Sequence, residues 1–307
     1  MSLPAAAGSP AHPTGLARFA LPLLLLGAAA IACSPIFVRL SELGPIATAV
    51  YRVLFALPAL ALFQQVVPAE RAAPKPGRSD WPLLGLAGFM FAGDLATWHW
   101  SIGLTSVANA TLLANFAPIF VTLGSWLIFG ERFSRLFLAG LAIAMLGAIT
   151  LMASSLSLGT EHLYGDLLGL CCGSFYGGYI LSIARLRSRL DTLTVMLWSG
   201  AVTFLLLLPL AWIQGESLVA PSLYGWVILI GLALISHAGG QGLITFSLAH
   251  LPAAFSSVAL LLQPVIAAIL AVLILHELPV VWQLVGGLIV LIGIYVAKRG
   301  SIDRAKS

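Results

Sequence analysis

The sequence predicts an all-α membrane protein with ten transmembrane helices, arranged as two inverted five-helix repeats with both termini cytoplasmic. Three observations lead to this fold: an apolar composition, ten apolar runs of membrane-spanning length, and a segment that recurs in the second half. The 307 residues are 60% hydrophobic and 8% charged, whereas soluble domains have about 45–50% and about 25%. So little charge cannot cover a water-soluble globule, and the bilayer is therefore the expected environment.

Apolar runs bounded by proline, glycine or charged residues mark the expected helices. A helix needs about 20 residues to cross the bilayer, and uninterrupted apolar runs favour helices over the alternating strands of a membrane barrel. The first five spans are expected at residues 20–40, 45–66, 81–102, 107–129 and 135–154, and the second five at 164–184, 193–213, 223–247, 252–275 and 280–297. The connections are short and leave no room for a soluble domain.

The chain accordingly divides into four parts. We expect a flexible N-terminal tail at residues 1–19, a first repeat at 20–155, a second repeat at 160–298 and a cytoplasmic tail at 299–307. The tail lacks a hydrophobic core followed by a small-residue cleavage site, so it is not expected to be a cleaved signal. The three cysteines, which lie inside apolar runs, are expected to be packing residues without a disulfide or metal: Cys33, Cys171 and Cys172.

Basic residues set the orientation, because short cytoplasmic loops of membrane proteins are rich in Lys and Arg. With a cytoplasmic N-terminus, 13 of the 15 basic residues fall on the inside: Arg18, Arg71, Lys75, Arg78, Arg132, Arg135, Arg185, Arg187, Arg189, Lys298, Arg299, Arg304 and Lys306. The other two, Arg39 and Arg52, lie in spans or at their ends. Topology and anionic lipid thus explain the net charge of +4, and no nucleic-acid partner is expected.

An internal repeat relates the two halves at an offset of 146 residues. The segment from Ala117 to Glu131 aligns with the segment from Gln263 to Glu277. Matching pairs at the same offset are Pro118 with Pro264, Glu131 with Glu277, Gly140 with Gly286, Gly147 with Gly293, Gly85 with Gly231, and Ser101 with Ser247. Because each half has an odd number of spans, the second half must be inserted upside down, an arrangement typical of transporters that expose a central site alternately.

These ten spans, and a proline followed 13 residues later by Glu at the helix end, resemble the EamA-type carriers of the drug/metabolite transporter superfamily. The resemblance covers about residues 20 to 297 and is closest to the aromatic amino-acid exporters of bacterial inner membranes. It implies an exporter of amino acids located in the bacterial inner membrane. Arg52 has no basic counterpart in the second half, which marks a difference between the repeats.

Two ionisable residues within spans, Arg52 and Asp94, are the first functional candidates, because charges in the bilayer core are costly. Counted along their helices, both lie about 10 Å below the outer surface. They could form a structural ion pair between the second and third helices, or Arg52 could extend toward the interface. Alternatively, Asp94 could line the transport pathway and bind a substrate amine or a proton.

Polar and aromatic residues inside otherwise apolar helices form the second group of candidates. We predict substrate contacts for Trp98, His99, Asn115, Tyr176, Tyr179, His237, Gln241 and Gln263. The competing interpretation is structural: Trp and Tyr often pack or lie at the membrane interface, and a single His or Gln often bonds to a neighbouring helix. Tyr176 and Tyr179 lie on a glycine-rich stretch, which could allow close helix packing or leave space for a ligand.

Pro118 and Pro264 are predicted hinges, because each removes a helix hydrogen bond near the bilayer centre. Their matching positions in the two repeats favour a shared mechanical role over accidental kinks. Glu131 and Glu277, at helix ends in opposite leaflets, are expected to be structural.

The sequence argues against an enzyme or an ATP-driven pump. It contains no HExxH motif and no phosphate-binding glycine loop, and it predicts no cofactor and no metal site. A channel is disfavoured because nothing resembles a selectivity filter or a ring of like charges. We therefore expect a secondary transporter of small amphipathic metabolites, most simply a monomer in the lipid bilayer. Alternatives are a carrier of drugs, nucleosides or sugar phosphates, or a channel-like facilitator.

Overall fold

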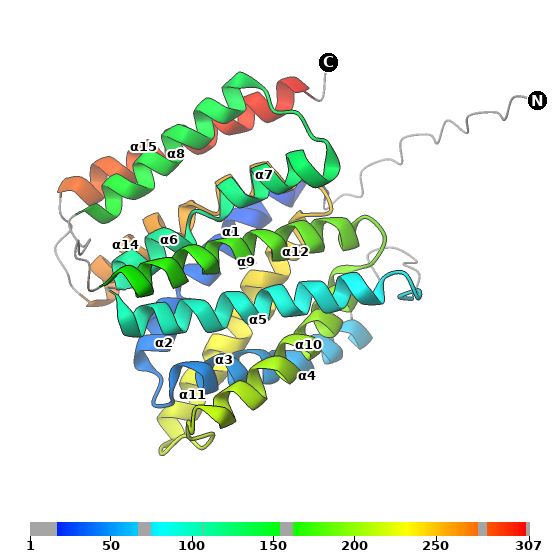
Figure 1. Ribbon diagram of the computed structural model, residues 1–307, viewed down its shortest axis with the longest axis vertical. Helices are drawn as coiled ribbons and strands as arrows, with labels where there is room; N and C mark the ends of the chain where they lie inside the picture. Colours follow the sequence, from blue (N-terminus) through cyan, green and yellow to red (C-terminus); the bar gives the residue numbers. More distant parts are fainter. Residues whose placement is uncertain (1–16, 67–74, 106, 154–161, 276–280, 305–307) are drawn as a thin grey trace, which may run out of the picture.

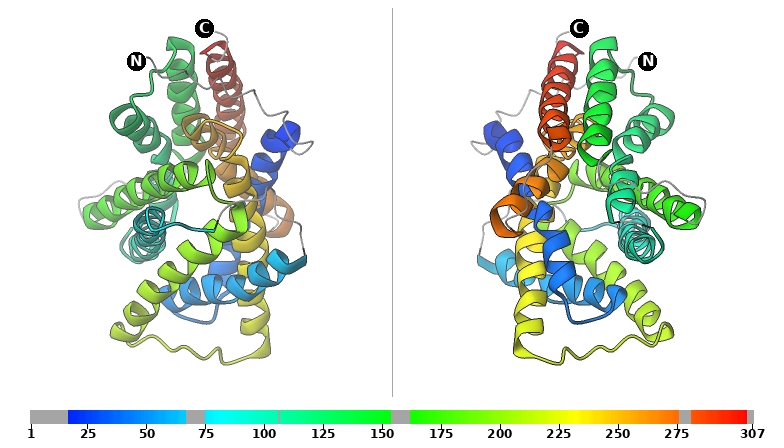
Figure 2. Two further views of the ribbon diagram at one scale, coloured as in Figure 1. Left: turned by 90° about the vertical axis from the view of Figure 1, so that its right-hand side faces the viewer. Right: turned by 90° about the vertical axis from the view of Figure 1, so that its left-hand side faces the viewer.

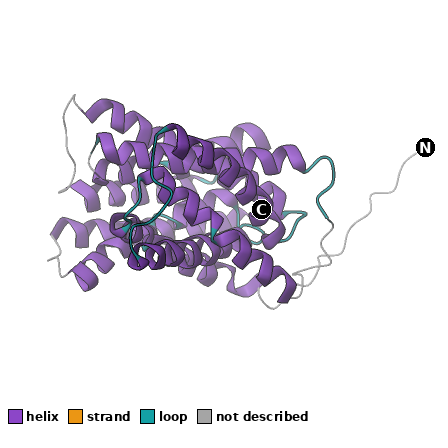
Figure 3. Ribbon diagram, turned by 90° about the horizontal axis from the view of Figure 1, so that it is seen from below, coloured by secondary structure: helices purple, strands orange, loops and turns teal. Residues whose placement is uncertain are grey.

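The computed structural model describes residues 17–66, 75–105, 107–153, 162–275 and 281–304. Every regular element within these ranges is a helix, as predicted (Figure 3). Nine helical segments among them are long and apolar enough to cross a membrane: Ala20–Leu40, Pro45–Val66, Asn109–Phe129, Arg135–Met152, Leu163–Arg187, Thr192–Ile213, Leu223–Ser247, Ala253–Leu270 and Val281–Ser301. The remaining expected span, α5 (Trp81–Leu104), is 24 residues long and carries the polar residues Asp94 and His99. Predictions for residues 1–16, Arg71, Glu277 and Lys306 concern positions outside the described ranges.

The first half of the chain contains several helices that are interrupted inside an expected span. Its elements are η1 (Ala17–Phe19), α1 (Ala20–Ala32), α2 (Ser34–Leu40), α3 (Pro45–Leu54), α4 (Ala56–Val66), α5, α6 (Val107–Ala114), α7 (Ala117–Phe129) and α8 (Arg135–Met152). The interruptions at Cys33, at Phe55 and before Ala117 were not predicted. Each is followed within three residues by a proline, which lacks the N–H that would continue the helix hydrogen bonds.

The second half repeats this pattern in part. Its elements are α9 (Leu163–Arg187), α10 (Thr192–Ile213), α11 (Leu223–Gly231), the π-helix η4 (Leu232–Gln241), α12 (Gly242–Ser247), α13 (Ala253–Ala259), α14 (Leu262–Leu275) and α15 (Val281–Arg304). The helix break at Leu260 and Leu261 matches the break at Asn115 and Phe116 to within one residue at the offset of 146. The final helix continues through residues 299–304, where the sequence analysis placed the cytoplasmic tail.

The last helices of the two repeats, α8 and α15, form a closely packed antiparallel pair at one edge of the molecule (Figure 1). Glycines allow the two backbones to approach. A Cβ added to Gly140 would lie 2.2 Å from the Ala297 nitrogen, and one added to Gly286 would lie 2.2 Å from the Leu151 nitrogen. Both distances are far shorter than any side chain allows, so no larger residue fits at either position.

The contacts of this pair are themselves related by the repeat. Ala297 and Leu151, the partners of Gly140 and Gly286, stand 146 residues apart, as do the two glycines. Repeat-equivalent helices thus run antiparallel and exchange equivalent contacts. This geometry is what an inverted repeat produces. The remaining helices lie to one side of this pair, and both described chain ends lie toward the same end of the molecule (Figures 1 and 2).

Candidate functional site

A cavity of about 140 Å³ lies between the two repeats. Nine residues singled out from the sequence line it: Arg52, Asp94, Trp98, Asn115, Pro118, Tyr176, Gln241, Gln263 and Pro264. The first repeat supplies the α1–α2 break, α3, α5 and the α6–α7 break, and the second supplies α9, η4 and the α13–α14 break. The cavity therefore occupies the repeat interface, where central sites of inverted-repeat transporters occur.

Three predicted contact residues lie outside the cavity lining and pack in a second layer. The Tyr179 ring stacks 4.7 Å from the ring of Phe91, and the His237 ring lies 5.4 Å from the same phenylalanine. Phe91 itself faces the cavity. His99 is buried on α5 with its ring 5.1 Å from that of Trp98. Tyr179, His237 and His99 thus support cavity-lining aromatic rings.

Arg52 is a buried cation on the cavity wall. Its side chain is 6% exposed, and its Nη1 donates a 3.1 Å hydrogen bond to the Ser34 hydroxyl. The guanidinium carbon lies 5.9 Å from the centre of the Phe91 ring. No described carboxylate forms an ion pair with it, and Nε has no partner within the described ranges. The guanidinium therefore keeps hydrogen-bonding capacity unused by the protein.

Asp94 shares the cavity with Arg52 but is not hydrogen-bonded to it. Its Oδ1 accepts a 3.1 Å hydrogen bond from the Cys172 thiol on α9. A thiol is a weak donor, so this contact only partly satisfies the carboxylate. Both side chains line the cavity with other partners, and the predicted direct ion pair between them is not formed in this conformation.

The π-helical turn in η4 brings a polar side chain to the cavity. A π-helix carries an extra residue per turn and is frequent at functional sites. Gln241, at the end of η4, is 1% exposed and lies beside the Tyr176 hydroxyl. Neither the Gln241 amide nitrogen nor the Tyr176 hydroxyl makes a hydrogen bond of ordinary geometry to a described residue. Both groups are thus available to a polar ligand.

Pro118 and Pro264 each stand in the first turn of a half-helix rather than within a continuous one. They follow the breaks at 115–116 and 260–261 and belong to the starts of α7 and α14. Proline is favourable in a first turn, where its missing N–H has no helical partner. Consequently the N-terminal ends of two half-helices, with their partial positive charge, border the cavity.

Four polar residues of the cavity lining were not predicted as substrate contacts: Ser34, Thr111, Cys172 and Ser257. Cys172 was assigned to packing, yet it contacts Asp94. A signal was present, because Cys172 precedes Tyr176 by four residues and therefore shares its helix face. Ser34 becomes accessible only through the break at Cys33, which the apolar pattern around it does not reveal.

Two glutamates join the repeats at the end of the molecule that holds the loops 41–44 and 214–222, here termed the far end. The Glu216 carboxylate accepts hydrogen bonds from the Ile46 and Ala47 amides, at 3.3 Å and 2.6 Å, at the start of α3. The Glu42 carboxylate accepts bonds from the Ser222 hydroxyl and amide, at 2.8 Å and 3.2 Å, at the start of α11. Each carboxylate thus caps a helix of the opposite repeat.

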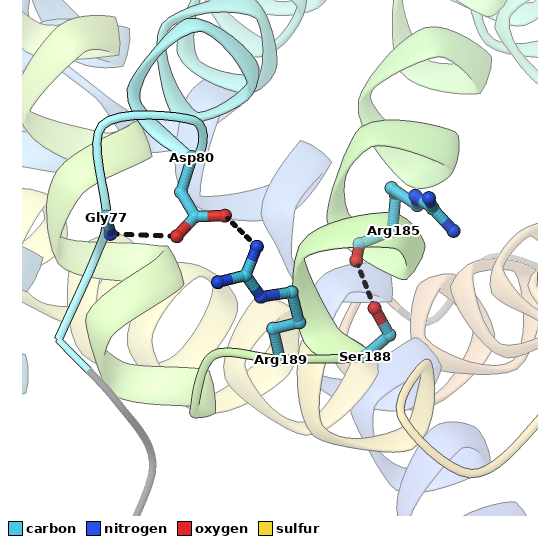
Figure 4. Close-up of polar contacts among 5 residues, drawn as sticks. All are labelled: Gly77, Asp80, Arg185, Ser188 and Arg189. Carbon is cyan, nitrogen blue, oxygen red and sulfur yellow. Dashed lines mark hydrogen bonds and ion pairs between the residues drawn. The ribbon is translucent and has the colours of Figure 1, made fainter. Parts of the chain in front are cut away.

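A different polar cluster closes the opposite end, where both described chain ends lie. Asp80, just before α5, accepts a 2.8 Å bond from the Gly77 amide and pairs with Arg189 at 3.3 Å (Figure 4). The buried Arg187 donates to the Thr245 carbonyl at 3.1 Å and so links α9 to α12. Polar contacts between the repeats therefore exist at both ends of the cavity.

A cavity between inverted repeats, with polar contacts between the repeats toward both ends of the molecule, is the arrangement expected of a carrier. Comparison with protein families agrees, because the model of the EamA-like transporter family matches residues 18–153 and again 163–298. The chain belongs to the EamA-like transporter family. The two matches show that it contains two EamA repeats, and they confirm the resemblance identified in the sequence.

Related proteins of this family carry exporter names. The chain is 28% identical over 222 residues to the pseudopaline exporter of Pseudomonas aeruginosa, covering 72% of this chain and 76% of that protein. It is 26% identical to a probable terminal-alkyne amino-acid exporter of Streptantibioticus cattleyicolor, over 76% and 78% of the two chains. A probable amino-acid metabolite efflux pump of Salmonella typhimurium is also 26% identical, over 70% and 75%.

A solved crystal structure shares the fold of this EamA-like protein. The TM-score is 0.78 over 92% of this chain and 98% of that one, at 17% identity. The family match and the exporter names indicate a multi-pass membrane transporter of small metabolites rather than an enzyme.

Proposed function

We propose that this protein is a secondary transporter that exports neutral amino acids, aromatic ones included, across the bacterial inner membrane by alternating access. The observation that carries the proposal is the cavity between the repeats, which combines an apolar and aromatic lining with Arg52 and Asp94. An amino acid has the same combination of an apolar side chain and two opposite charges. The names of two relatives, which mention amino acids, are consistent with this substrate class.

Ten spans with both termini in the cytoplasm form part of the proposal. Helix α5 would be the third span and would complete the count of ten: its 24 residues suffice to cross the bilayer, and its polar residues Asp94 and His99 face protein rather than lipid. The segregation of basic residues supports the orientation.

Alternating access would occur by rocking of two groups of helices about the helix breaks. The first group contains α5, α6–α7 and α9, and the second contains α1–α2, α11–α12 and α13–α14. The breaks before Pro118 and Pro264 border the cavity, so bending there changes access to it directly. The polar contacts of Glu42 and Glu216 at the far end and of Asp80 with Arg189 at the opposite end would break in turn.

The energy source distinguishes two versions of this mechanism. If Asp94 exchanges a proton during the cycle, export is coupled to the proton gradient. If Asp94 keeps its charge throughout, transport is facilitated diffusion down the amino-acid gradient. Asp94 is the acidic side chain that lines the cavity, so substituting it by Asn separates the two versions.

The volume of the cavity bears on the alternative substrates. A cavity of about 150 Å³ takes up benzene in a well-studied protein, and drug-sized ligands occupy about 300–1,000 Å³. At about 140 Å³, this cavity suits a compact amino acid as it stands, whereas a nucleoside, a drug or a large aromatic amino acid requires its walls to move. A channel-like facilitator finds less support, because polar contacts join the repeats toward both ends of the molecule.

The proposal is tested by uptake of radiolabelled Phe, Trp, Thr and Met into proteoliposomes, with and without a pH gradient. We expect saturable uptake of at least one amino acid by the wild type, inhibited by the same unlabelled compound. Empty liposomes and the variant Arg39→Gln, which alters an exposed arginine away from the cavity, provide controls. If no labelled amino acid is taken up, or if unlabelled amino acids do not inhibit the uptake, the amino-acid assignment is refuted, while the family fold is unaffected.

A further inference from the structure

The unmatched charge of Arg52 carries a further inference. Charged side chains within a membrane are normally paired with an opposite charge. Arg52 is only 6% exposed, and among the described residues its hydrogen-bond partner is the neutral Ser34 hydroxyl. No carboxylate of the described residues forms an ion pair with the guanidinium. An anion delivered by the ligand would supply the missing partner.

A second, independent feature points to an anion at the same cavity. The starts of α7 and α14, helices of 13 and 14 residues, border the cavity through Ala117, Pro118, Gln263 and Pro264. The N-terminal end of a helix carries a partial positive charge, although here Pro118 and Pro264 have no N–H and the Ile119 and Gln263 amides already bond to carbonyls. In transporters, such half-helix ends at the bilayer midplane point toward anionic groups of the substrate.

Asp94 provides an acidic group in the same cavity. Its Oδ1 accepts the Cys172 thiol, and no described residue donates to its second carboxylate oxygen. Asp94 and Arg52 line the same cavity without pairing with each other, so its wall holds one basic and one acidic side chain. A ligand with both charges a short distance apart can satisfy both, whereas a ligand with one charge leaves the other uncompensated.

We propose that Arg52 and the N-terminal ends of α7 and α14 bind the α-carboxylate of the substrate, while Asp94 binds its α-ammonium group. The recognised class is the free zwitterionic amino acid. Amides and decarboxylated amines lack the anionic group, and N-acylated amino acids lack the cationic one. This assignment rests on the proposed function and adds the groups by which the substrate is recognised.

The test uses competition against uptake of the best radiolabelled amino acid by the wild-type protein in proteoliposomes. Two competitors are derived from that amino acid: its carboxamide, which removes the negative charge, and its N-acetyl derivative, which removes the positive charge. We expect each derivative to compete about ten- to 100-fold more weakly than the free amino acid, the range given by loss of one charged hydrogen-bonded contact. Equal competition by the carboxamide would overturn the role of Arg52.

Variants assign each charge to its wall position. Arg52→Gln should remove the preference for the free acid over the carboxamide but keep the preference for the free amine over the N-acetyl derivative. Asp94→Asn should do the opposite. The control Arg39→Gln should keep both preferences. If Arg52→Gln retains full discrimination against the carboxamide, the assignment is wrong.

A binding measurement tests the same preferences in variants whose transport is too slow to measure. Ligand-induced stabilisation of purified protein against heat reports the same discrimination without turnover, and it also shows whether the variant is folded. Arg52→Lys, which keeps the charge but loses the planar fork, should retain part of the preference for the free acid. Failure of the proposed function appears differently, as absence of amino-acid uptake or stabilisation in the wild type.

Discussion

Ser101 and Ser247 make the same hydrogen bond in opposite halves of the molecule. The Ser101 hydroxyl, on α5, donates to the Gly165 carbonyl near the start of α9 at 2.7 Å. The Ser247 hydroxyl, on α12, donates to the Ala20 carbonyl at the start of α1 at 2.9 Å. The serines stand 146 residues apart, and each joins the third span of one repeat to the first span of the other. The repeats are therefore linked by equivalent polar contacts.

Loss of either serine hydroxyl should destabilise the protein. Both residues are fully buried, so Ser101→Ala or Ser247→Ala leaves a buried carbonyl with one partner fewer, a loss of about 1–3 kcal/mol. Because the two bonds lie in different repeat contacts, their effects should add. Thermal unfolding in detergent measures both effects. The control is Thr150→Ala, an exposed hydroxyl that bonds within its own helix, and an equal effect there would contradict the interpretation.

The glycines between α8 and α15 should tolerate no larger side chain. A Cβ on Gly147 would lie 2.5 Å from the Val290 nitrogen, and one on Gly293 would lie 2.3 Å from the Ala144 nitrogen. Gly147→Leu should therefore force the helices apart and lower the yield of folded protein or the unfolding temperature markedly. Gly85→Leu is the matched control, because no atom lies within 4 Å of a Cβ added there. Unchanged stability of Gly147→Leu would show that the helices do not pack as described.

The Cys172 thiol should report occupancy of the cavity. It lines the cavity, whereas the adjacent Cys171 is exposed on another helix face. In a variant with Cys33→Ala and Cys171→Ala, a methanethiosulfonate reagent should inhibit uptake, and excess substrate should slow that inhibition several-fold. Modification of Cys171 in a variant with Cys33→Ala and Cys172→Ala should leave uptake unchanged. An inhibition rate that is the same with and without substrate would contradict the position of Cys172 in the cavity.

The glutamate clamps should hold the far end closed. Glu216→Gln removes the negative charge that caps α3, and loss of charged hydrogen bonds costs about 1.5–3 kcal/mol. We expect the population open at the far end to rise about tenfold or more, read as faster reaction of Cys172 with an impermeant thiol reagent applied from that side. Glu42→Gln should act in the same direction at α11.

The sidedness of this effect provides its control. Asp80→Asn breaks the ion pair with Arg189 at the opposite end, and it should accelerate the same reaction from the opposite side of the membrane. Because Arg189 is 56% exposed, we expect a smaller effect, since exposed pairs contribute about 0–1 kcal/mol. Identical changes from both sides for both variants would indicate general loosening rather than two separate closures.

The sequence predicted the helices because apolar length is a strong local signal, and the repeat because glycine and proline recur at one offset. It predicted nine of the cavity residues because polar side chains in a membrane helix usually face protein. The helix breaks were not predicted. A proline follows each of them, but the apolar pattern continues across the break and hides it. Without the breaks, neither the access of Ser34 nor the half-helix ends at Ala117 and Leu262 could be anticipated.

Contacts between segments far apart in the sequence could not be predicted either. Arg52 and Asp94 were correctly brought to one region by depth counting, but their actual partners, Ser34 and Cys172, depend on how helices rotate about their axes. His237 and Gln241 were placed on one helix face by α-helical spacing. In the structure Gln241 lines the cavity, whereas His237, one turn earlier in η4, packs against Phe91, which itself lines the cavity.

The most direct test of alternating access at the central cavity is counterflow. Proteoliposomes loaded with a high concentration of an unlabelled neutral amino acid are diluted into a trace of the same labelled compound. A carrier with one alternately exposed site accumulates the label transiently above the outside concentration, and we predict this overshoot for the wild type. Equilibration without an overshoot, together with saturable amino-acid uptake, would contradict alternating access and indicate a channel-like pathway.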